Sequence, residues 1–161
     1  MTKTIGLFSG SFDPVTKGHL DIIRRSSSLF EKLYVGILHN VEKEGYFSFE
    51  QRVKMLQGAL RGLDNVEVIM ANDVLTVTLA RQVGVTHLVR SLRNAKDLDY
   101  EADLAFYNHH LAQELETVFL LTKPELAYIS SSRVRELLHF GVDISPFVPE
   151  SVLLELEKGH Q

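Results

Sequence analysis

Residues 10–19 read Gly10-Ser11-Phe12-Asp13-Pro14-Val15-Thr16-Lys17-Gly18-His19. The apolar run Ile5–Phe8 precedes them and predicts a buried strand. Apolar residues at helical spacing follow them: Leu20, Ile22, Ile23, Leu29 and Phe30. The ten residues therefore predict a strand-to-helix loop, with Thr16 as the N-cap and His19 in the first helical turn. Helix N-termini carry unpartnered N–H groups and the positive end of the dipole, so this loop is a candidate phosphate site.

Strand and helix patterns alternate along the rest of the chain. Apolar runs predict further strands at residues 33–38, 66–70, 87–90 and 117–121. Helical patterns are predicted at residues 48–60, 75–83, 100–111, 130–140 and 149–159. This alternation is typical of an α/β protein. We expect a Rossmann-like, doubly wound, five-stranded parallel sheet with helices on both faces, in a single domain spanning residues 1–161.

The composition of the chain argues against several classes of protein. The formal net charge of -4 argues against a general nucleic-acid binder, which needs many cations against phosphates. The chain has no cysteine, so disulfides and thiolate metal sites are excluded. No apolar stretch is long enough to span a bilayer, and no signal peptide is visible at the N-terminus. We therefore expect a cytoplasmic protein without a membrane or nucleic-acid partner.

Candidate functional residues follow four of the predicted strands. They lie in the loops at residues 10–19, 39–43, 90–93 and 128–132. In open parallel sheets, ligands bind beyond the carboxyl ends of the strands, where the strand order reverses. Because all four loops belong to that edge, we expect them to converge on one site. No Walker-type phosphate loop and no dinucleotide-binding G-x-G-x-x-G occurs, which disfavours a P-loop kinase and a dehydrogenase.

The motif G-S-F-D-P-x-T-x-G-H resembles the signature of the nucleotidylyltransferase superfamily, whose members attack the α-phosphorus of a nucleoside triphosphate and release pyrophosphate. Most branches have histidine where this chain has Thr16, and threonine there resembles the bacterial phosphopantetheine adenylyltransferases. The segments Asn40–Lys43, Arg90–Glu101 and Ser130–Glu136 resemble the same family, in its order. Two positions depart from its pattern: Val41 replaces the usual proline, and Ser91 the usual glycine.

The resemblance implies adenylyl transfer from ATP to 4′-phosphopantetheine, which gives dephospho-coenzyme A and pyrophosphate. It implies Mg²⁺ carried by the triphosphate, without a cage of protein ligands. It also implies a homohexamer and feedback by coenzyme A. A sibling transferase, acting on nicotinate mononucleotide or with CTP, is the alternative enzyme. A nucleotide sensor without catalysis is the alternative from another class, and pyrophosphate release would distinguish it.

The implied reaction needs in-line positioning and charge stabilisation, because the attacking phosphate is already ionised at neutral pH. His19 is predicted to stabilise the transition state by donating an N–H, and Lys43 and Arg93 complete the predicted catalytic set. The predicted acceptor site comprises Ser11, Lys43, Thr76 and Arg90. The predicted ATP site comprises Ser11, Phe12, His19, Ser91, Leu92, Arg93, Glu101, Leu126, Ala127, Tyr128, Ile129, Ser130, Ser131 and Ser132.

Overall fold

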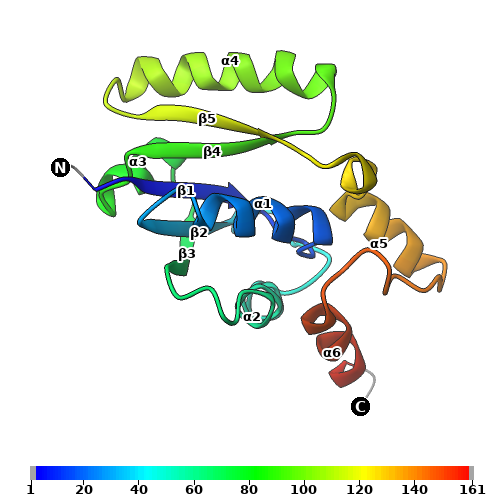
Figure 1. The fold of residues 1–161 in the computed structure, drawn as a ribbon. Coiled ribbons are helices and arrows are strands. Elements are labelled where there is room, and N and C mark those ends of the chain that lie inside the picture. The colour runs from blue at the N-terminus through cyan, green and yellow to red at the C-terminus, as the bar shows by residue number, and fades with distance from the viewer. Residues whose placement is uncertain (1–2, 160–161) are drawn as a thin grey trace.

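The computed structural model describes residues 3–159 and contains one five-stranded sheet (Figure 1). Every neighbouring pair of strands is parallel, and the order across the sheet is β3-β2-β1-β4-β5. The strands are β1 (Ile5–Gly10), β2 (Lys32–His39), β3 (Val66–Asn72), β4 (His87–Leu92) and β5 (Glu116–Leu121). The chain steps outward in one direction from β1 to β3 and then crosses to β4 on the other side. The strand order therefore reverses between β1 and β4.

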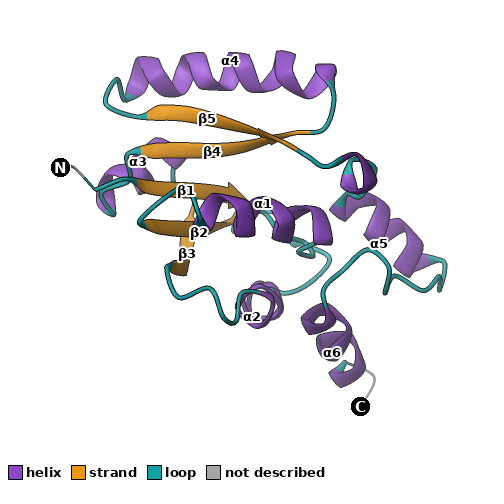
Figure 2. Ribbon diagram, in the orientation of Figure 1, coloured by secondary structure: helices purple, strands orange, loops and turns teal. Residues whose placement is uncertain are grey.

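Helices cover both faces of the sheet (Figure 2). They are α1 (Lys17–Ser27), α2 (Phe49–Ala59), α3 (Thr76–Gln82), α4 (Ala95–Leu111), α5 (Ser131–His139) and α6 (Glu150–Lys158), with the short 3₁₀ helix η1 (Pro124–Leu126). One buried cluster joins β1 and β2 to α1, α2 and α6, and a second joins the sheet to α3. These two cores confirm the predicted doubly wound, Rossmann-like α/β fold.

Side-chain caps explain where four helices begin. The side chains of Thr16, Ser48, Asn94 and Ser130 each accept a hydrogen bond from the backbone N–H three residues later. Each such bond satisfies a donor that has no partner inside the helix. The predicted N-cap Thr16 is confirmed, and Ser48 and Ser130 cap the helices predicted at residues 48–60 and 130–140. Gly84 and Gly141 follow α3 and α5 with φ of 73° and 70°, which suits glycine at a helix end.

Two predicted boundaries were wrong. Strand β4 runs to Leu92 and not only to the predicted end at Arg90, so Ser91 lies inside the strand rather than after it. Helix α4 begins at Ala95, five residues before Tyr100, because Asn94 caps it. Its first turn places the charged Lys96 and Asp97 between Ala95 and Leu98, so the apolar pattern there is weak, although asparagine before it is a residue type that favours the N-cap. Among residues 3–159, no helix combines the length and the hydropathy that crossing a bilayer would require.

Candidate active site

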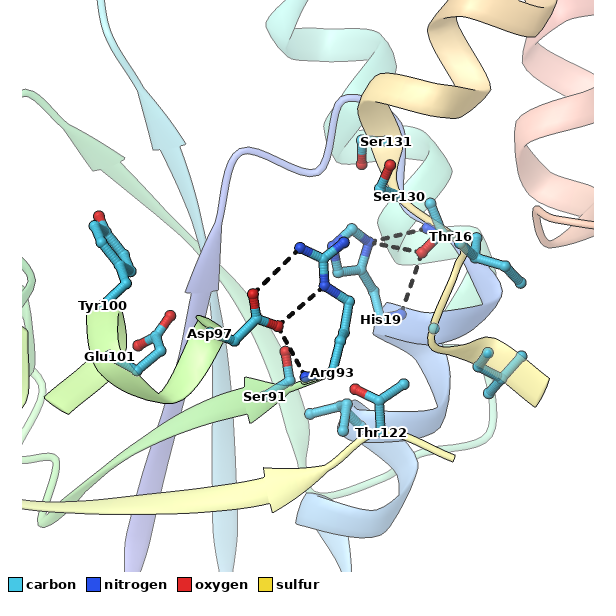
Figure 3. A pocket seen from close by; sticks show the side chains of 14 residues that line it. Thr16, His19, Ser91, Arg93, Asp97, Tyr100, Glu101, Thr122, Ser130 and Ser131 are labelled. Carbon is cyan, nitrogen blue, oxygen red and sulfur yellow. Dashed lines mark hydrogen bonds and ion pairs between the residues drawn. The ribbon is translucent and has the colours of Figure 1, made fainter. Parts of the chain in front are cut away.

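A cavity of about 340 Å³ opens at the carboxyl edge of the sheet, where the order reverses between β1 and β4. The first turns of α1, the end of β4, the start of α4 and the segment from the end of β5 to α5 enclose it (Figure 3). Its lining residues are Thr16, Gly18, His19, Ile22, Ser91, Arg93, Asp97, Tyr100, Glu101, Thr122, Leu126, Ile129, Ser130 and Ser131. The predicted convergence of strand-end loops is thus confirmed for β1, β4 and the segment after β5.

His19 is held by the residue that caps its own helix. The Thr16 backbone N–H donates to His19 Nδ1 at 3.0 Å, and the His19 N–H donates to Thr16 Oγ1 at 3.3 Å. Since Nδ1 accepts a hydrogen bond from a backbone N–H, the proton of a neutral imidazole sits on Nε2. Burial, and then the charge of Arg93, lower the pKa of His19 to about 4. At neutral pH the ring is therefore uncharged, with Nε2–H as its donor.

Arg93 lies beside His19 and is held by Asp97 (Figure 3). The Arg93 backbone N–H donates to Asp97 Oδ2 at 2.8 Å, and Arg93 Nε lies 3.2 Å from the same oxygen. Burial would raise the pKa of Asp97, but the Arg93 side chain and backbone, together with the Asn94 bond, hold it below its usual value. The ionised Asp97 carboxylate therefore fixes the Arg93 guanidinium just beyond the carboxyl end of β4.

Arg90 and Glu101 form a second ion pair, with two parallel hydrogen bonds. Arg90 Nε lies 2.7 Å from Glu101 Oε2, and Arg90 Nη2 lies 2.8 Å from Oε1. The side chain of Glu101 is only 10% exposed, and that of Arg90 is 25% exposed. The structure therefore pairs a residue predicted to bind the acceptor with one predicted to bind ATP. Glu101 lines the cavity, whereas Arg90 is not among its lining residues.

The loop between β1 and α1 is fixed from the side of α5. Ser131 Oγ donates to the Pro14 carbonyl and Arg135 Nη1 donates to the Asp13 carbonyl, each at 2.7 Å. The Asp13 carboxylate is buried and accepts the backbone N–H groups of residues 46–47 at 2.8 and 2.9 Å. The Asp-Pro pair of the motif therefore anchors the loop to two distant segments, which keeps Thr16 and His19 in place.

Comparison with known proteins identifies the family of the chain. Residues 7–137 match the family described as cytidylyltransferase-like. The phosphopantetheine adenylyltransferase of Streptococcus mutans is 61% identical over 158 residues, which cover 98% of this chain and 95% of that protein. The Streptococcus gordonii enzyme of the same name is 58% identical, covering 98% and 96%. The chain belongs to the phosphopantetheine adenylyltransferase family.

The fold also matches a solved structure of low sequence identity. A Vibrio parahaemolyticus protein assigned as a nicotinate-nucleotide adenylyltransferase superposes with a TM-score of 0.74 at 19% identity, covering 98% of this chain and 94% of that one. At that identity the match shows the shared fold alone. The fold derived above from strand order and helix placement therefore also occurs in that protein.

Eight of the residues predicted to bind ATP line the cavity. They are His19, Ser91, Arg93, Glu101, Leu126, Ile129, Ser130 and Ser131. Phe12 and Leu92 are buried instead, and the Phe12 ring packs against the His19 ring with centroids 5.0 Å apart. Ser11, Ala127, Tyr128 and Ser132 lie outside the lining. Phe12 therefore supports His19 from the core side, and its side chain does not reach the cavity.

The predicted acceptor residues Lys43 and Thr76 lie away from this cavity. Lys43 is exposed in a turn after β2, where its N–H donates to the Asn40 carbonyl at 3.1 Å, and Thr76 opens α3. A smaller cavity of about 300 Å³ lies between the ends of β2 and β3. Its lining residues are Leu38, His39, Asn40, Ala71, Asp73, Val74 and Leu75. The structure therefore separates a cavity beside β4 from one beside β2.

Sequence reasoning missed Ile22, Asp97, Tyr100 and Thr122 as lining residues. A signal existed for Thr122, which directly follows β5 at the same sheet edge as the other candidates. Asp97 and Tyr100 lie in the part of α4 whose start was misplaced. Ser91, which replaces the family's usual glycine, lies in β4 opposite Leu120 and is not among the described residues with positive φ. Its backbone is therefore unstrained.

Proposed function

We propose that this protein transfers the adenylyl group of ATP to 4′-phosphopantetheine, as the names of its relatives indicate. An oxygen of the acceptor phosphate forms a bond to the α-phosphorus, and the bond between the α-phosphorus and the bridging oxygen breaks. The products are dephospho-coenzyme A and pyrophosphate. The observation that carries the proposal is the neutral His19, with Nε2–H as its donor, in a cavity that also holds Arg93.

His19 acts on the α-phosphate in this proposal. The acceptor phosphate is ionised at neutral pH, so the reaction needs no general base at the attacking oxygen. It needs donors where negative charge accumulates, and they act best when they are fixed before the substrate arrives. The bond from Thr16 fixes the ring, and the Arg93–Asp97 pair fixes a cation beside it. Both groups can then stabilise the transition state without reorganising.

The triphosphate lies along the N-terminal ends of α1 and α5. Ser130 and Ser131 stand at the start of α5 and line the cavity with Thr16 and Gly18 from the start of α1. Two helix ends facing one cavity supply unpartnered N–H groups and positive dipole ends to the same anion. Leu126 and Ile129 provide apolar surface that suits a base.

The acceptor approaches from the β2 side. Lys43 and Arg90 are the cations proposed for its phosphate, and Arg90 keeps Nη1 for this contact while Nε and Nη2 hold Glu101. The cavity between the ends of β2 and β3 is lined mainly by apolar side chains, including Val74 and Leu75 next to Thr76. We assign it to the pantetheine arm.

Magnesium is proposed to arrive with ATP, coordinated by triphosphate oxygens and water. Bound there, it would neutralise charge on the leaving pyrophosphate. The carboxylates that line the cavity, Asp97 and Glu101, are engaged by arginines, so we expect any contact with the ion to run through water. Within residues 3–159, no group of three or more histidine, aspartate or glutamate side chains is placed to hold a metal ion.

A homohexamer, feedback by coenzyme A and a cytoplasmic location complete the proposal. The surface of α4 supports self-association, because several of its large apolar side chains are exposed: Leu98, Tyr100, Phe106, Tyr107 and Leu111. Sedimentation of the wild-type protein and of Phe106→Glu tests this assembly. We expect a hexamer that the charged side chain breaks into smaller species. Coenzyme A should compete with the acceptor, since it carries the same pantetheine arm.

The function is tested by pyrophosphate release with ATP and a panel of acceptors. We expect 4′-phosphopantetheine to be the preferred acceptor, with nicotinate mononucleotide and unphosphorylated pantetheine far poorer. Replacing ATP with CTP should abolish most of the activity. Preference for nicotinate mononucleotide would indicate the sibling enzyme, and ATP binding without pyrophosphate release from any acceptor would indicate a sensor.

A further inference from the structure

Arg52 of α2 is a buried cation that the proposed reaction does not use. Its residue exposure is 5%, and its guanidinium packs 5.5 Å from the centre of the Phe49 ring. Within residues 3–159, no carboxylate lies within ion-pair distance of it, and its buried Nε has no partner. A buried charge without a counter-ion is costly to keep, so the hydrogen bonds that Arg52 makes must offset that cost.

The contacts of Arg52 lead to the phosphate loop. Arg52 Nη1 donates to the Ser11 carbonyl at 2.8 Å and lies 3.4 Å from the Leu38 carbonyl. Leu38 is near the end of β2, so Arg52 reaches the loop from the β2 side of β1. The Ser11 carbonyl is thereby turned toward β2, into the protein.

The peptide bond carries this orientation to Phe12. In a trans peptide, the carbonyl of one residue and the N–H of the next point in opposite directions, and the Ser11–Phe12 bond is trans. The Ser11 carbonyl points toward β2, so the Phe12 N–H points away from β2. In the order β2-β1-β4, that direction is the side of β4, where Ser91 and Arg93 line the cavity. The structure records no partner for this N–H within residues 3–159. Phe12 has φ of 45°, so its backbone is held in a conformation that is uncommon for a bulky side chain.

We propose that Arg52 is a positioning residue for the phosphate loop, which holds the Ser11 carbonyl inward so that the Phe12 N–H is presented to an ATP phosphate. The same buried charge attracts the polyanion, because no carboxylate neutralises it. Arg52 touches no substrate and acts through the Ser11–Phe12 peptide. This inference rests on the proposed function, since it requires ATP in the cavity beside β4.

The test combines ATP titration with the amide spectrum of ¹⁵N-labelled protein. In the wild-type protein, we expect ATP to move the Phe12 amide resonance strongly, as a new hydrogen bond to phosphate does. Arg52→Gln should bind ATP about tenfold more weakly, because it loses roughly one hydrogen bond between the Phe12 N–H and a charged phosphate oxygen. The Phe12 amide resonance of this variant should move little when ATP is added. Arg61→Gln removes the same charge from an exposed site just beyond α2 and should bind ATP as the wild type does.

The outcomes separate the inference from the function. A wild-type Phe12 amide that does not move while ATP binds would overturn the inference, and this measurement needs no variant to fold. Wild-type ATP affinity in a folded Arg52→Gln would overturn it as well. A protein that binds no ATP at all would contradict the proposed function together with the inference.

Discussion

The backbone N–H of Thr16 donates to Nδ1 of His19 at 3.0 Å and so places the imidazole proton on Nε2. The threonine at the variable position of the motif thus fixes the tautomer of the histidine three residues later. Its side chain also caps the helix on which that histidine lies. The helix cap and the proposed catalytic donor therefore belong to one hydrogen-bonded arrangement.

Removing the imidazole should lower turnover with little change in ATP binding. His19→Ala is expected to reduce kcat by about 100-fold or more, as the loss of one preorganised donor to a developing oxyanion does. The ATP dissociation constant should change much less, because the donor serves the transition state. Steady-state kinetics and ATP titration on the same preparation check this. A variant with near-normal kcat would remove His19 from the mechanism.

His19 should also make stability depend on pH. Its folded pKa of about 4 lies below the usual value of 6.5, so the unfolded chain binds the proton first as pH falls. The free energy of unfolding should therefore fall between pH 6.5 and about 4, by at most roughly 1.4 kcal/mol per pH unit from this group. Urea unfolding at pH 7, 6 and 5 measures it. His19→Asn should show a shallower slope, and equal slopes would refute the assignment.

Ser91 should tolerate replacement by the family's usual glycine. The residue lies in β4 with unstrained backbone, so Ser91→Gly is expected to leave ATP affinity and turnover nearly unchanged. Stability should drop by about 0.5–1 kcal/mol, because glycine is unfavourable inside a strand. Calorimetric titration with ATP and thermal unfolding test both statements. Tenfold weaker ATP binding would mean that the hydroxyl contacts a phosphate.

Lys43 and Arg90 should serve the acceptor more than ATP. Lys43→Ala is expected to raise the KM for 4′-phosphopantetheine by about 10- to 100-fold, the value of a charge-assisted contact. Unphosphorylated pantetheine should be no worse a substrate for the variant than for the wild type. Lys123→Ala, which removes a cation bound to Asp21, is the matched control. Equal losses for ATP and acceptor would contradict the assignment of Lys43.

Arg90 requires a different design, because its removal leaves Glu101 unpaired. Arg90→Ala alone should destabilise the protein by about 3–5 kcal/mol, because it leaves the buried Glu101 carboxylate without its partner. The double change Arg90→Ala and Glu101→Gln should recover most of that stability while the KM for the acceptor stays raised. Thermal unfolding and acceptor kinetics on both variants check this. Recovery of the acceptor KM in the double variant would show that Arg90 acts only on the fold.

Much of this arrangement could be predicted from local patterns. Apolar runs located all five strands, and the sheet edge rule brought His19, Arg93 and Ser131 to one cavity. The partners of the cations could not be predicted, because Arg90–Glu101 and Arg93–Asp97 depend on how α4 packs on β4. The burial of the Phe12 ring was also missed, because it depends on how the loop packs against the core. The position of Phe12 in the motif indicates the ligand, but its ring fills the core against His19.

The most direct test of the central claim follows the α-phosphate itself. The protein is incubated with [α-³²P]ATP and 4′-phosphopantetheine, and the products are separated. We predict that the label appears in dephospho-coenzyme A, that the released pyrophosphate is unlabelled, and that His19→Ala lowers the rate of label transfer by about 100-fold or more. No transfer of label to 4′-phosphopantetheine, or transfer to nicotinate mononucleotide in preference to it, would contradict the account.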